Sequence, residues 1–257
     1  MKLAPNPFTH AIAAGEKQLG TWSSLANGFA AEVIASAGFD WALLDMEHTP
    51  SDYFALLGQL QAFAASNTTA IVRPEWNDSV VVKRLLDLGA QGLLFPMIQS
   101  VEEAEKAVAA TRYPPHGMRG VSGATRATKF GRITDYNARV EEETTVILQL
   151  ETGLAISRAE EIAAVDGVSG IFFGPADIAA DMGLLGQPLH EDVWALIRPA
   201  AQKIIKIGKP VGTLVFDPVF AAQLLNEGFT FVAGGADTSL LARASDALLA
   251  NIKSNLK

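Results

Sequence analysis

The sequence predicts a (β/α)8 barrel, the TIM-barrel fold. Eight short apolar runs rich in Val, Ile, Leu and Phe alternate along the chain with segments of helical periodicity, and this alternation is typical of a parallel sheet covered by helices on both faces. Eight such units in 257 residues also fit the usual size of this barrel. An open doubly wound sheet is the competing architecture. It would want a glycine-rich fingerprint after its first strand, and the segment SLANGFAAE found there has none.

The predicted strands are, in chain order, QLGTWSS (18–24), WALLDM (41–46), TAIVRP (69–74), GLLFPM (92–97), TVILQLE (145–151), GIFFGP (170–175), PVGTLV (210–215) and FTFVAG (229–234). Helical periodicity fills the segments between them, as in SDYFALLGQLQAFA, SVVVKRLLDLG, VEEAEKAVAATR and DPVFAAQLLNEG. The residues that stand where helix N-caps or C-terminal stops belong are Ser51, Asp78 and Asp217 for the caps and Gly89 and Gly228 for the stops. We expect a single barrel domain over residues 1–257.

Two segments interrupt the regular alternation of predicted strands and helices. A long, polar, arginine-rich loop over residues 113–143 follows the fourth strand region, and residues 176–208 contain two helical pieces. Long loops between a strand and the next helix of a barrel usually carry function. We therefore expect both segments to have a functional role.

The composition narrows the class of protein. The chain is 49% hydrophobic and 19% charged, which is typical of a compact protein with a large core. A net charge of −8 and a pI of about 5.0 argue against nucleic acid or an anionic membrane as the main partner. With no cysteine, a disulfide framework and a thiol nucleophile are excluded. No signal-like or membrane-spanning apolar run is found, so we expect a cytoplasmic protein that acts on small molecules.

Polar side chains follow several of the predicted strands. In this fold the chemistry collects at the carboxyl ends of the strands. The residues found there are Asp45, Glu47, His48, Arg73, Gln99, Gln149, Glu151 and Asp177. Carboxylates, one arginine and one histidine together have the composition of a divalent-metal enolate site.

Glu151 and Asp177 are the candidate metal ligands. They follow adjacent strands, so their carboxylates can converge on one ion, and two carboxylates with open positions suit Mg²⁺ or Mn²⁺. The alternative is that Asp177 simply caps the next helix. The segment GPAD also offers anion-binding parts, because Gly174 allows close backbone approach and the helix opening at Ala176 presents free N–H groups.

Purely structural roles are the alternatives for Arg73 and His48. Arg73 can donate to an enolate or carboxylate oxygen, or it can form a rim ion pair with Glu75 or Asp78. A lone histidine at a strand end is more often structural than catalytic. No predicted strand carries a lysine, and a Schiff-base aldolase would need one, so metal-stabilised enolate chemistry is favoured.

The motifs LLDMEHTP, VRPEWND, LLDLGAQGLLFPMIQSVEEAEKAV, YPPHGMRGVSGATRATKFGR, LQLET and FFGPADIAADMG together resemble the HpcH/HpaI family of class II pyruvate aldolases, over nearly the whole chain and in family order. The resemblance implies a phosphoenolpyruvate/pyruvate-type barrel whose C-terminal helix is swapped between protomers of a homohexamer, a trimer of dimers. It also implies reversible aldol cleavage of 4-hydroxy-2-oxo acids to pyruvate, or hydroxypyruvate, plus an aldehyde, with Mg²⁺, Mn²⁺ or Co²⁺ as cofactor.

By resemblance, Glu151 and Asp177 are the two metal ligands, Arg73 contacts the keto or enolate oxygen, and Gln149 lies beside the bound oxo acid. The backbone of the turn that opens the next helix is expected to hold the carboxylate of that oxo acid. The residues of this turn are Gly174, Pro175, Ala176 and Asp177.

The resemblance further implies that His48 and Asp45 form a dyad in which Asp45 orients the imidazole and His48 transfers the proton. Leu214 is expected to border the methyl group of pyruvate. Arg119 and Arg126 of the arginine-rich loop are expected to face the distal end of the substrate across a subunit interface. Two rival functions stay open: a citrate-lyase-β-like lyase acting on a CoA thioester, and a barrel that binds oxo acids without catalysis.

Overall fold

The computed structural model describes residues 1–256 and contains the predicted barrel. Eight parallel strands close in the order β1-β2-β3-β4-β5-β6-β7-β8, with β8 hydrogen-bonded to β1. The strands are β1 (Gln18–Ser23), β2 (Trp41–Asp45), β3 (Thr69–Arg73), β4 (Gly92–Phe95), β5 (Thr145–Leu150), β6 (Gly170–Phe173), β7 (Val211–Leu214) and β8 (Phe231–Ala236). All eight predicted strands are confirmed.

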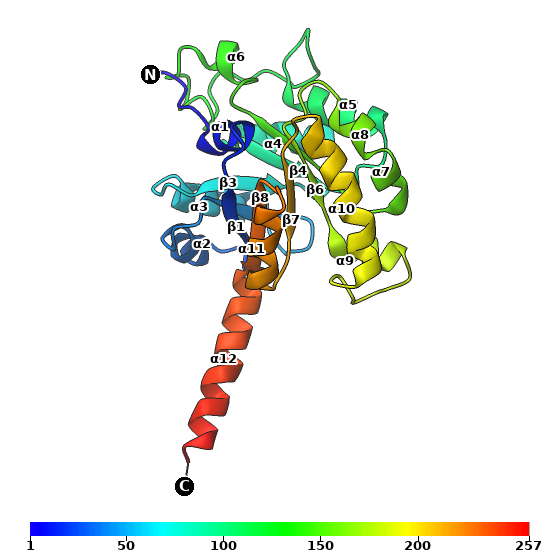
Figure 1. Ribbon diagram of the computed structural model, residues 1–257. Helices are drawn as coiled ribbons and strands as arrows, with labels where there is room; N and C mark the ends of the chain where they lie inside the picture. The colour runs from blue at the N-terminus through cyan, green and yellow to red at the C-terminus, as the bar shows by residue number, and fades with distance from the viewer. Residues whose placement is uncertain (257) are drawn as a thin grey trace.

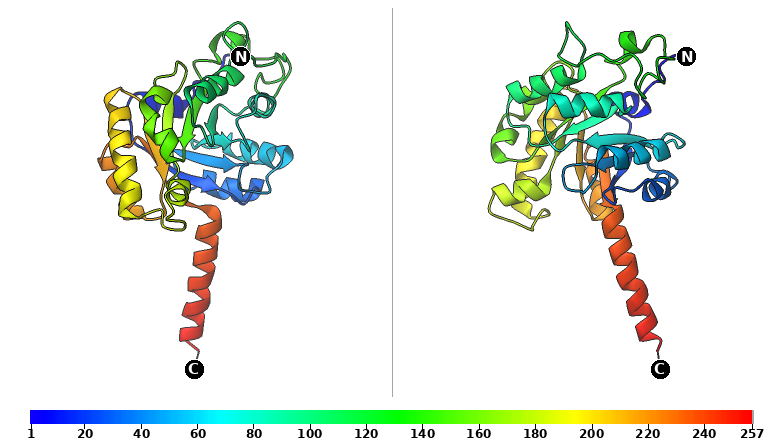
Figure 2. Two further views of the ribbon diagram at one scale, coloured as in Figure 1. Left: turned by 90° about the vertical axis from the view of Figure 1, so that its right-hand side faces the viewer. Right: turned by 180° about the vertical axis from the view of Figure 1, so that it is seen from behind.

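Most of the helices surround the barrel, whereas α1 and α6 lie at one end of it and α12 projects from the other (Figures 1 and 2). They are α1 (Pro7–Ala13), α2 (Gly28–Ala35), α3 (Tyr53–Phe63), α4 (Ser79–Asp87), α5 (Val101–Thr111), α6 (Tyr136–Arg139), α7 (Gly153–Ser157), α8 (Ala159–Ala163), α9 (Pro175–Asp181), α10 (Glu191–Lys206), α11 (Pro218–Asn226) and α12 (Asp237–Ser254). Within residues 1–256, no helix is both long and apolar enough to cross a membrane.

Most of the expected helix signals are confirmed. Caps or stops are found at Asp78, Asp217, Gly89 and Gly228, the two glycines with φ of 97° and 107°. The expectation for Ser51 is wrong, because the carboxylate of Asp52 accepts the first free N–H groups of α3 from Phe54 and Ala55. A cap must have extended backbone just before the first helical residue, and that residue is Asp52.

Aromatic side chains fill the inside of the barrel. Trp22, Trp41, Phe172 and Phe231 pack ring against ring, with centroids 5.5–6.3 Å apart. This filling requires glycine on the strands: a Cβ on Gly20 would lie 2.1 Å from the Trp41 ring. Such packing makes the barrel a solid core that holds the strand ends in place.

The long loop 113–143 lies at the end of the barrel opposite to the expected one. Helix α5 comes between β4 and this loop, so the loop leads from a helix into β5 and reaches the amino ends of the strands. Figure 1 shows its helix α6 beside the N-terminus, at the far end of the barrel from α9 and α12. It is therefore a helix-to-strand loop, and it does not border the carboxyl ends of the strands in its own barrel. Residues 176–208, with α9 and α10, do follow a strand.

Helix α12 leaves the barrel instead of packing on it. Figures 1 and 2 show it projecting from the end of β8 into open space, and its only buried residue is Asp237. The large apolar side chains that it exposes are Leu240, Leu241, Leu248, Leu249 and Ile252. The position of an eighth covering helix is thus not filled by the chain's own α12.

Candidate functional site

The first half of the site joins the carboxyl ends of β2 and β3. Asp45 and Arg73 are paired residues in the register of these strands. Arg73 Nε donates to Asp45 Oδ1 at 2.9 Å and Nη2 donates to Oδ2 at 2.8 Å. Both side chains are buried. This bidentate geometry fixes the guanidinium plane.

Glu47 forms an ion pair with another nitrogen of the same guanidinium. Its Oε2 lies 2.9 Å from Arg73 Nη1, and its backbone N–H donates to Asp45 Oδ1 at 3.0 Å. The ring of Trp22 lies under the guanidinium, with its centroid 5.5 Å from Arg73 Cζ. The rim pairing of Arg73 with Glu75 or Asp78 is therefore wrong. From the sequence, Glu47 is expected to support the site rather than to bind the metal. The structure shows that it pairs with Arg73, a contact that its adjacency in DMEH alone does not predict.

His48 lies at the mouth of the site. Its side chain is 66% exposed, and its Nε2 is 3.8 Å from Glu47 Oε2. The expected contact between His48 and Asp45 is not found, because both carboxylate oxygens of Asp45 accept hydrogen bonds from Arg73. In this chain the carboxylate near the imidazole is Glu47. The pKa of the Glu47 carboxyl is raised by burial, against the opposing effect of Arg73.

Glu151 and Asp177 form the second half of the candidate site. Glu151 directly follows β5 and is buried, and its Oε1 accepts the backbone N–H of Met97 at 2.9 Å. Burial, then a hydrogen bond with Asp177, raises the pKa of Glu151 to about 8. The structure thus brings the two carboxyl groups together, as the sequence predicts.

Gly174 makes room for this carboxyl group. A Cβ at this position would lie 3.1 Å from Glu151 Cγ and 3.2 Å from its Oε2. Gly174 is also the N-cap of α9, and no side chain caps this helix. The alternative reading of Asp177 as the cap is therefore wrong. Asp177 lies in the first turn with an exposed side chain.

The remaining predicted residues lie around this pair of carboxyl groups. Gln149 is near the end of β5, and its buried Oε1 has no hydrogen-bond partner among residues 1–256. Leu214 ends β7 half-buried against the aromatic core of the barrel. Pro175 is buried and Ala176 is exposed at the start of α9. An unpartnered buried amide oxygen is unusual in a folded protein, and it marks Gln149 as a group that a ligand could satisfy.

The charges of the two halves act on one another. The pKa of Glu47 is affected by Asp177, that of Glu151 by Glu47, and that of Arg73 by Glu151. Asp45, Glu47 and Glu151 therefore all act on one guanidinium, and Asp177 adds a fourth carboxyl group that acts on Glu47 and Glu151. A divalent cation beside Glu151 and Asp177 would offset this excess of negative charge. Among residues 1–256 no group of three or more His, Asp or Glu side chains is arranged to hold a metal ion. The candidate ligand set is therefore the pair of Glu151 and Asp177 alone.

The match to known proteins agrees with this geometry. Residues 18–244 match the description HpcH/HpaI aldolase/citrate lyase. The chain belongs to this family. A pyruvate aldolase from Rhizobium etli is 50% identical over 97% of this chain and 98% of its own length. A 4-hydroxy-2-oxo-heptane-1,7-dioate aldolase from Salmonella dublin is 48% identical over 95% and 94%.

Solved structures show the same fold. An HpcH/HpaI aldolase/citrate lyase family protein from Burkholderia cenocepacia superimposes with a TM-score of 0.93 and 36% identity, covering 96% of this chain and 99% of that one. The family resemblance that the sequence motifs predict is thus confirmed.

Arg119 and Arg126, which the family resemblance places near a substrate, lie at the far end of their own barrel. Arg119 is buried, donates to Asp87 Oδ1 at 3.0 Å and stacks on Tyr113 with its Cζ 4.6 Å from the ring centroid. Arg126 donates to the carbonyl of Leu88 at 2.7 Å. Neither guanidinium lies beside the carboxyl ends of the strands in its own chain. The expected contact with substrate across a subunit interface therefore stays a prediction.

Proposed function

We propose that this protein catalyses the reversible aldol cleavage of 4-hydroxy-2-oxo acids to pyruvate, or hydroxypyruvate, plus an aldehyde. The observation that carries the proposal is the pairing of buried Glu151 with Asp177 in the same site as an arginine held by two carboxylates. Family membership and the aldolase names of relatives that are about half identical support it. For that reason we prefer it to a CoA-thioester lyase or a non-catalytic barrel.

Glu151 and Asp177 would hold a divalent cation, Mg²⁺, Mn²⁺ or Co²⁺. Hard carboxylate oxygens suit these ions, and a cation would displace the proton that burial keeps on Glu151. When bound, the ion withdraws electron density from the keto group of the oxo acid and stabilises the negative charge of the enolate.

Arg73 supplies a second stabilising charge. Two of its N–H groups donate to Asp45, and Nη1 is paired with Glu47 by charge without a hydrogen bond, which leaves N–H groups on both terminal nitrogens free to donate. These hydrogens are directed at the keto oxygen, where charge develops as the bond between C3 and C4 breaks. Because the two carboxylates fix the guanidinium plane before substrate arrives, little reorganisation is needed during the reaction.

The other residues bind and orient the oxo acid. The carboxylate of the substrate accepts backbone N–H groups of Ala176 and Asp177 at the opening of α9, next to Gly174 and Pro175. Gln149 offers the amide that lacks a partner in the protein. Leu214 borders the methyl group of pyruvate.

During cleavage His48 takes the proton from the C4 hydroxyl as the bond between C3 and C4 breaks and the aldehyde leaves, and this proton then goes to C3 of the enolate to give pyruvate; condensation runs the same steps in reverse. An imidazole is suited to this task near neutral pH. Glu47, 3.8 Å from Nε2, stabilises the imidazolium that forms. Asp45 supports the reaction by holding Arg73, rather than by contacting His48 directly.

The exposed helix α12 suggests how the protein assembles. Its apolar side chains and those left exposed on α2 and α11, among them Phe29, Val33 and Val219, exceed what a monomer usually leaves in water. We propose that α12 packs on the barrel of a second copy, within the homohexamer that the family resemblance implies.

The test is cleavage of a 4-hydroxy-2-oxo acid by His48→Ala, with pyruvate release followed by a coupled dehydrogenase. We expect kcat to fall about 10²- to 10⁴-fold, the usual contribution of a general base. The matched control is His116→Ala, an exposed histidine of the loop 113–143, which should keep full activity. Near wild-type cleavage by His48→Ala would remove His48 from the chemistry. Full activity in EDTA would exclude the metal, and absence of deuterium exchange into the methyl group of pyruvate would exclude the enolate.

A further inference from the structure

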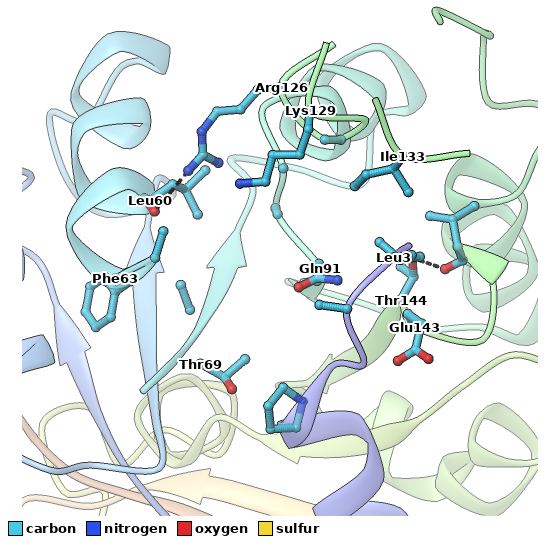
Figure 3. A pocket seen from close by; sticks show the side chains of 18 of the residues that line it. Leu3, Leu60, Phe63, Thr69, Gln91, Arg126, Lys129, Ile133, Glu143 and Thr144 are labelled. Atoms are coloured by element: carbon cyan, nitrogen blue, oxygen red, sulfur yellow. Dashed lines mark hydrogen bonds between the residues drawn. The ribbon is translucent and has the colours of Figure 1, made fainter. Parts of the chain in front are cut away.

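A second hollow lies at the amino-terminal end of the barrel. This cavity of about 700 Å³ is lined by the starts of three strands, at Thr69, Gln91 and Thr144, and is closed by residues 1–4 and part of the loop 113–143. Figure 3 shows these walls from close by. The cavity is thus separated by the length of the barrel from the site at the strand ends, and it has no part in the proposed aldol reaction.

Two cations face this cavity without an anionic partner. The half-buried guanidinium of Arg126 donates only to backbone carbonyls, to Leu88 at 2.7 Å and to Leu60 at 3.3 Å. The side-chain ammonium of Lys129 makes no hydrogen bond or ion pair with the rest of the described chain, residues 1–256, although its backbone N–H donates to the carbonyl of Arg126 at 2.9 Å. Both side chains reach toward the same space in Figure 3. Burial lowers the pKa of the Arg126 guanidinium, so a nearby anion would stabilise its charged form.

The wall offers no free carboxylate to neutralise these cations. Its one acidic side chain is Glu143, which accepts hydrogen bonds from Arg139 at 2.5 Å and from the backbone N–H of Asn6 at 2.7 Å. Lys2 also lines this wall, with its ammonium 3.9 Å from Asp135 Oδ2. A local excess of positive charge in a chain of net charge −8 is a feature that attracts anions.

The rest of the wall suits an organic molecule. The side-chain amide of Gln91 has no hydrogen bond within the described chain, so it is free to contact a ligand. Apolar side chains also line the cavity, with Phe63 on one side of it and Leu3 and Ile133 on the other. Binding sites for small molecules commonly combine apolar walls with a few convergent polar groups in this way.

We propose that this cavity binds a small organic anion, with its oxyanion group between Arg126 and Lys129 and its apolar body against Leu3, Phe63 and Ile133. The guanidinium supplies directed donors, and the ammonium supplies a compact charge. The site is distinct from the strand-end site of its own chain, and this role for Arg126 is an alternative to the contact with a neighbouring subunit's substrate that the family resemblance implies.

The test measures binding of phenyl phosphate and of inorganic phosphate to the full-length protein by isothermal titration calorimetry at constant ionic strength. Phenyl phosphate should bind about tenfold more tightly than inorganic phosphate, because its ring buries apolar surface. Lys129→Gln should weaken phenyl phosphate binding by about tenfold, the usual effect of losing one charge-assisted contact. Lys129 is exposed, so this variant should fold normally.

Arg126→Gln should weaken binding at least as much, with folding checked by circular dichroism. Two controls locate the ligand. Lys106→Gln removes an exposed cation from α5 and should bind like the wild type. Asp177→Asn alters the catalytic site and should also leave binding unchanged. The proposal is overturned if neither phosphate binds, if binding survives in both Lys129→Gln and Arg126→Gln, or if it is lost in Asp177→Asn, which would place the anion at the strand ends.

Discussion

The raised pKa of Glu151 predicts that this carboxyl group destabilises the metal-free protein at neutral pH. Its pKa is about 8 in the folded chain against an ordinary value of 4.5, so between these values the folded state binds more protons than the unfolded state. Stability must then fall as pH rises through this window. The slope for a single group is about 1.4 kcal/mol per pH unit, and at pH 7 the accumulated cost is about 3 kcal/mol.

Glu151→Gln removes this cost while keeping the shape of the side chain. Its amide oxygen can accept the Met97 N–H that Glu151 accepts at 2.9 Å, and its amide nitrogen can donate to Asp177. In EDTA at pH 7, we expect the variant to have a free energy of unfolding higher than the wild type by up to about 3 kcal/mol. The same variant should lose metal binding.

The assay is urea unfolding in EDTA at pH 5, 6, 7 and 8, at one fixed protein concentration. The wild type should lose stability across this series, and the difference between the two proteins should be smallest at pH 5. Glu105→Gln, an exposed position on α5, is the matched control and should follow the wild type. A variant that is less stable than the wild type at pH 7, or a difference that does not change with pH, would refute the reasoning.

Three further predictions concern the rest of the molecule. Asp45→Ala leaves the buried guanidinium of Arg73 without its bidentate partner, so urea unfolding should show a loss of about 3 kcal/mol or more; an unchanged midpoint would contradict this. Gly174→Ala places a methyl group 3.2 Å from Glu151 Oε2, so calorimetry should show Mn²⁺ affinity reduced by about 10- to 100-fold, whereas wild-type affinity would show that the carboxyl group has room to move. Removing residues 240–257, most of α12, should convert the proposed homohexamer to smaller species in sedimentation velocity, and an assembly of unchanged size would show that α12 does not join the copies.

Helix caps show what the local sequence can predict and what it cannot. The carboxylates of Asp78 and Asp217 cap their helices as predicted, because a cap depends on its own backbone and the next few residues. Ser51 and Asp52 are both good capping residues, and their composition alone does not choose between them. The choice falls to Asp52 because the path of the loop after β2 brings it, not Ser51, to the first turn of α3.

The arginine-rich loop shows a different kind of error. Its length and polarity predict function, but its place in the barrel depends on whether a strand or a helix precedes it. Since α5 ends at Thr111, the loop 113–143 belongs to the amino-terminal end of the barrel. There it helps to close the cavity lined by Arg126 and Lys129, a feature that composition alone does not predict.

The barrel and the chemical groups at the carboxyl ends of its strands can be predicted from the sequence. Periodicity and strand order are local properties, and Glu151, Asp177, Arg73 and His48 follow strands that the sequence locates. Which of these groups contact one another cannot be predicted in this way, because it depends on tertiary contacts. Asp45 binds Arg73 rather than His48 because the register of β2 against β3 places them side by side, and Glu47 is turned toward both Arg73 and His48. Contacts between strands depend on register and on closure of the barrel, which no single segment of the chain contains.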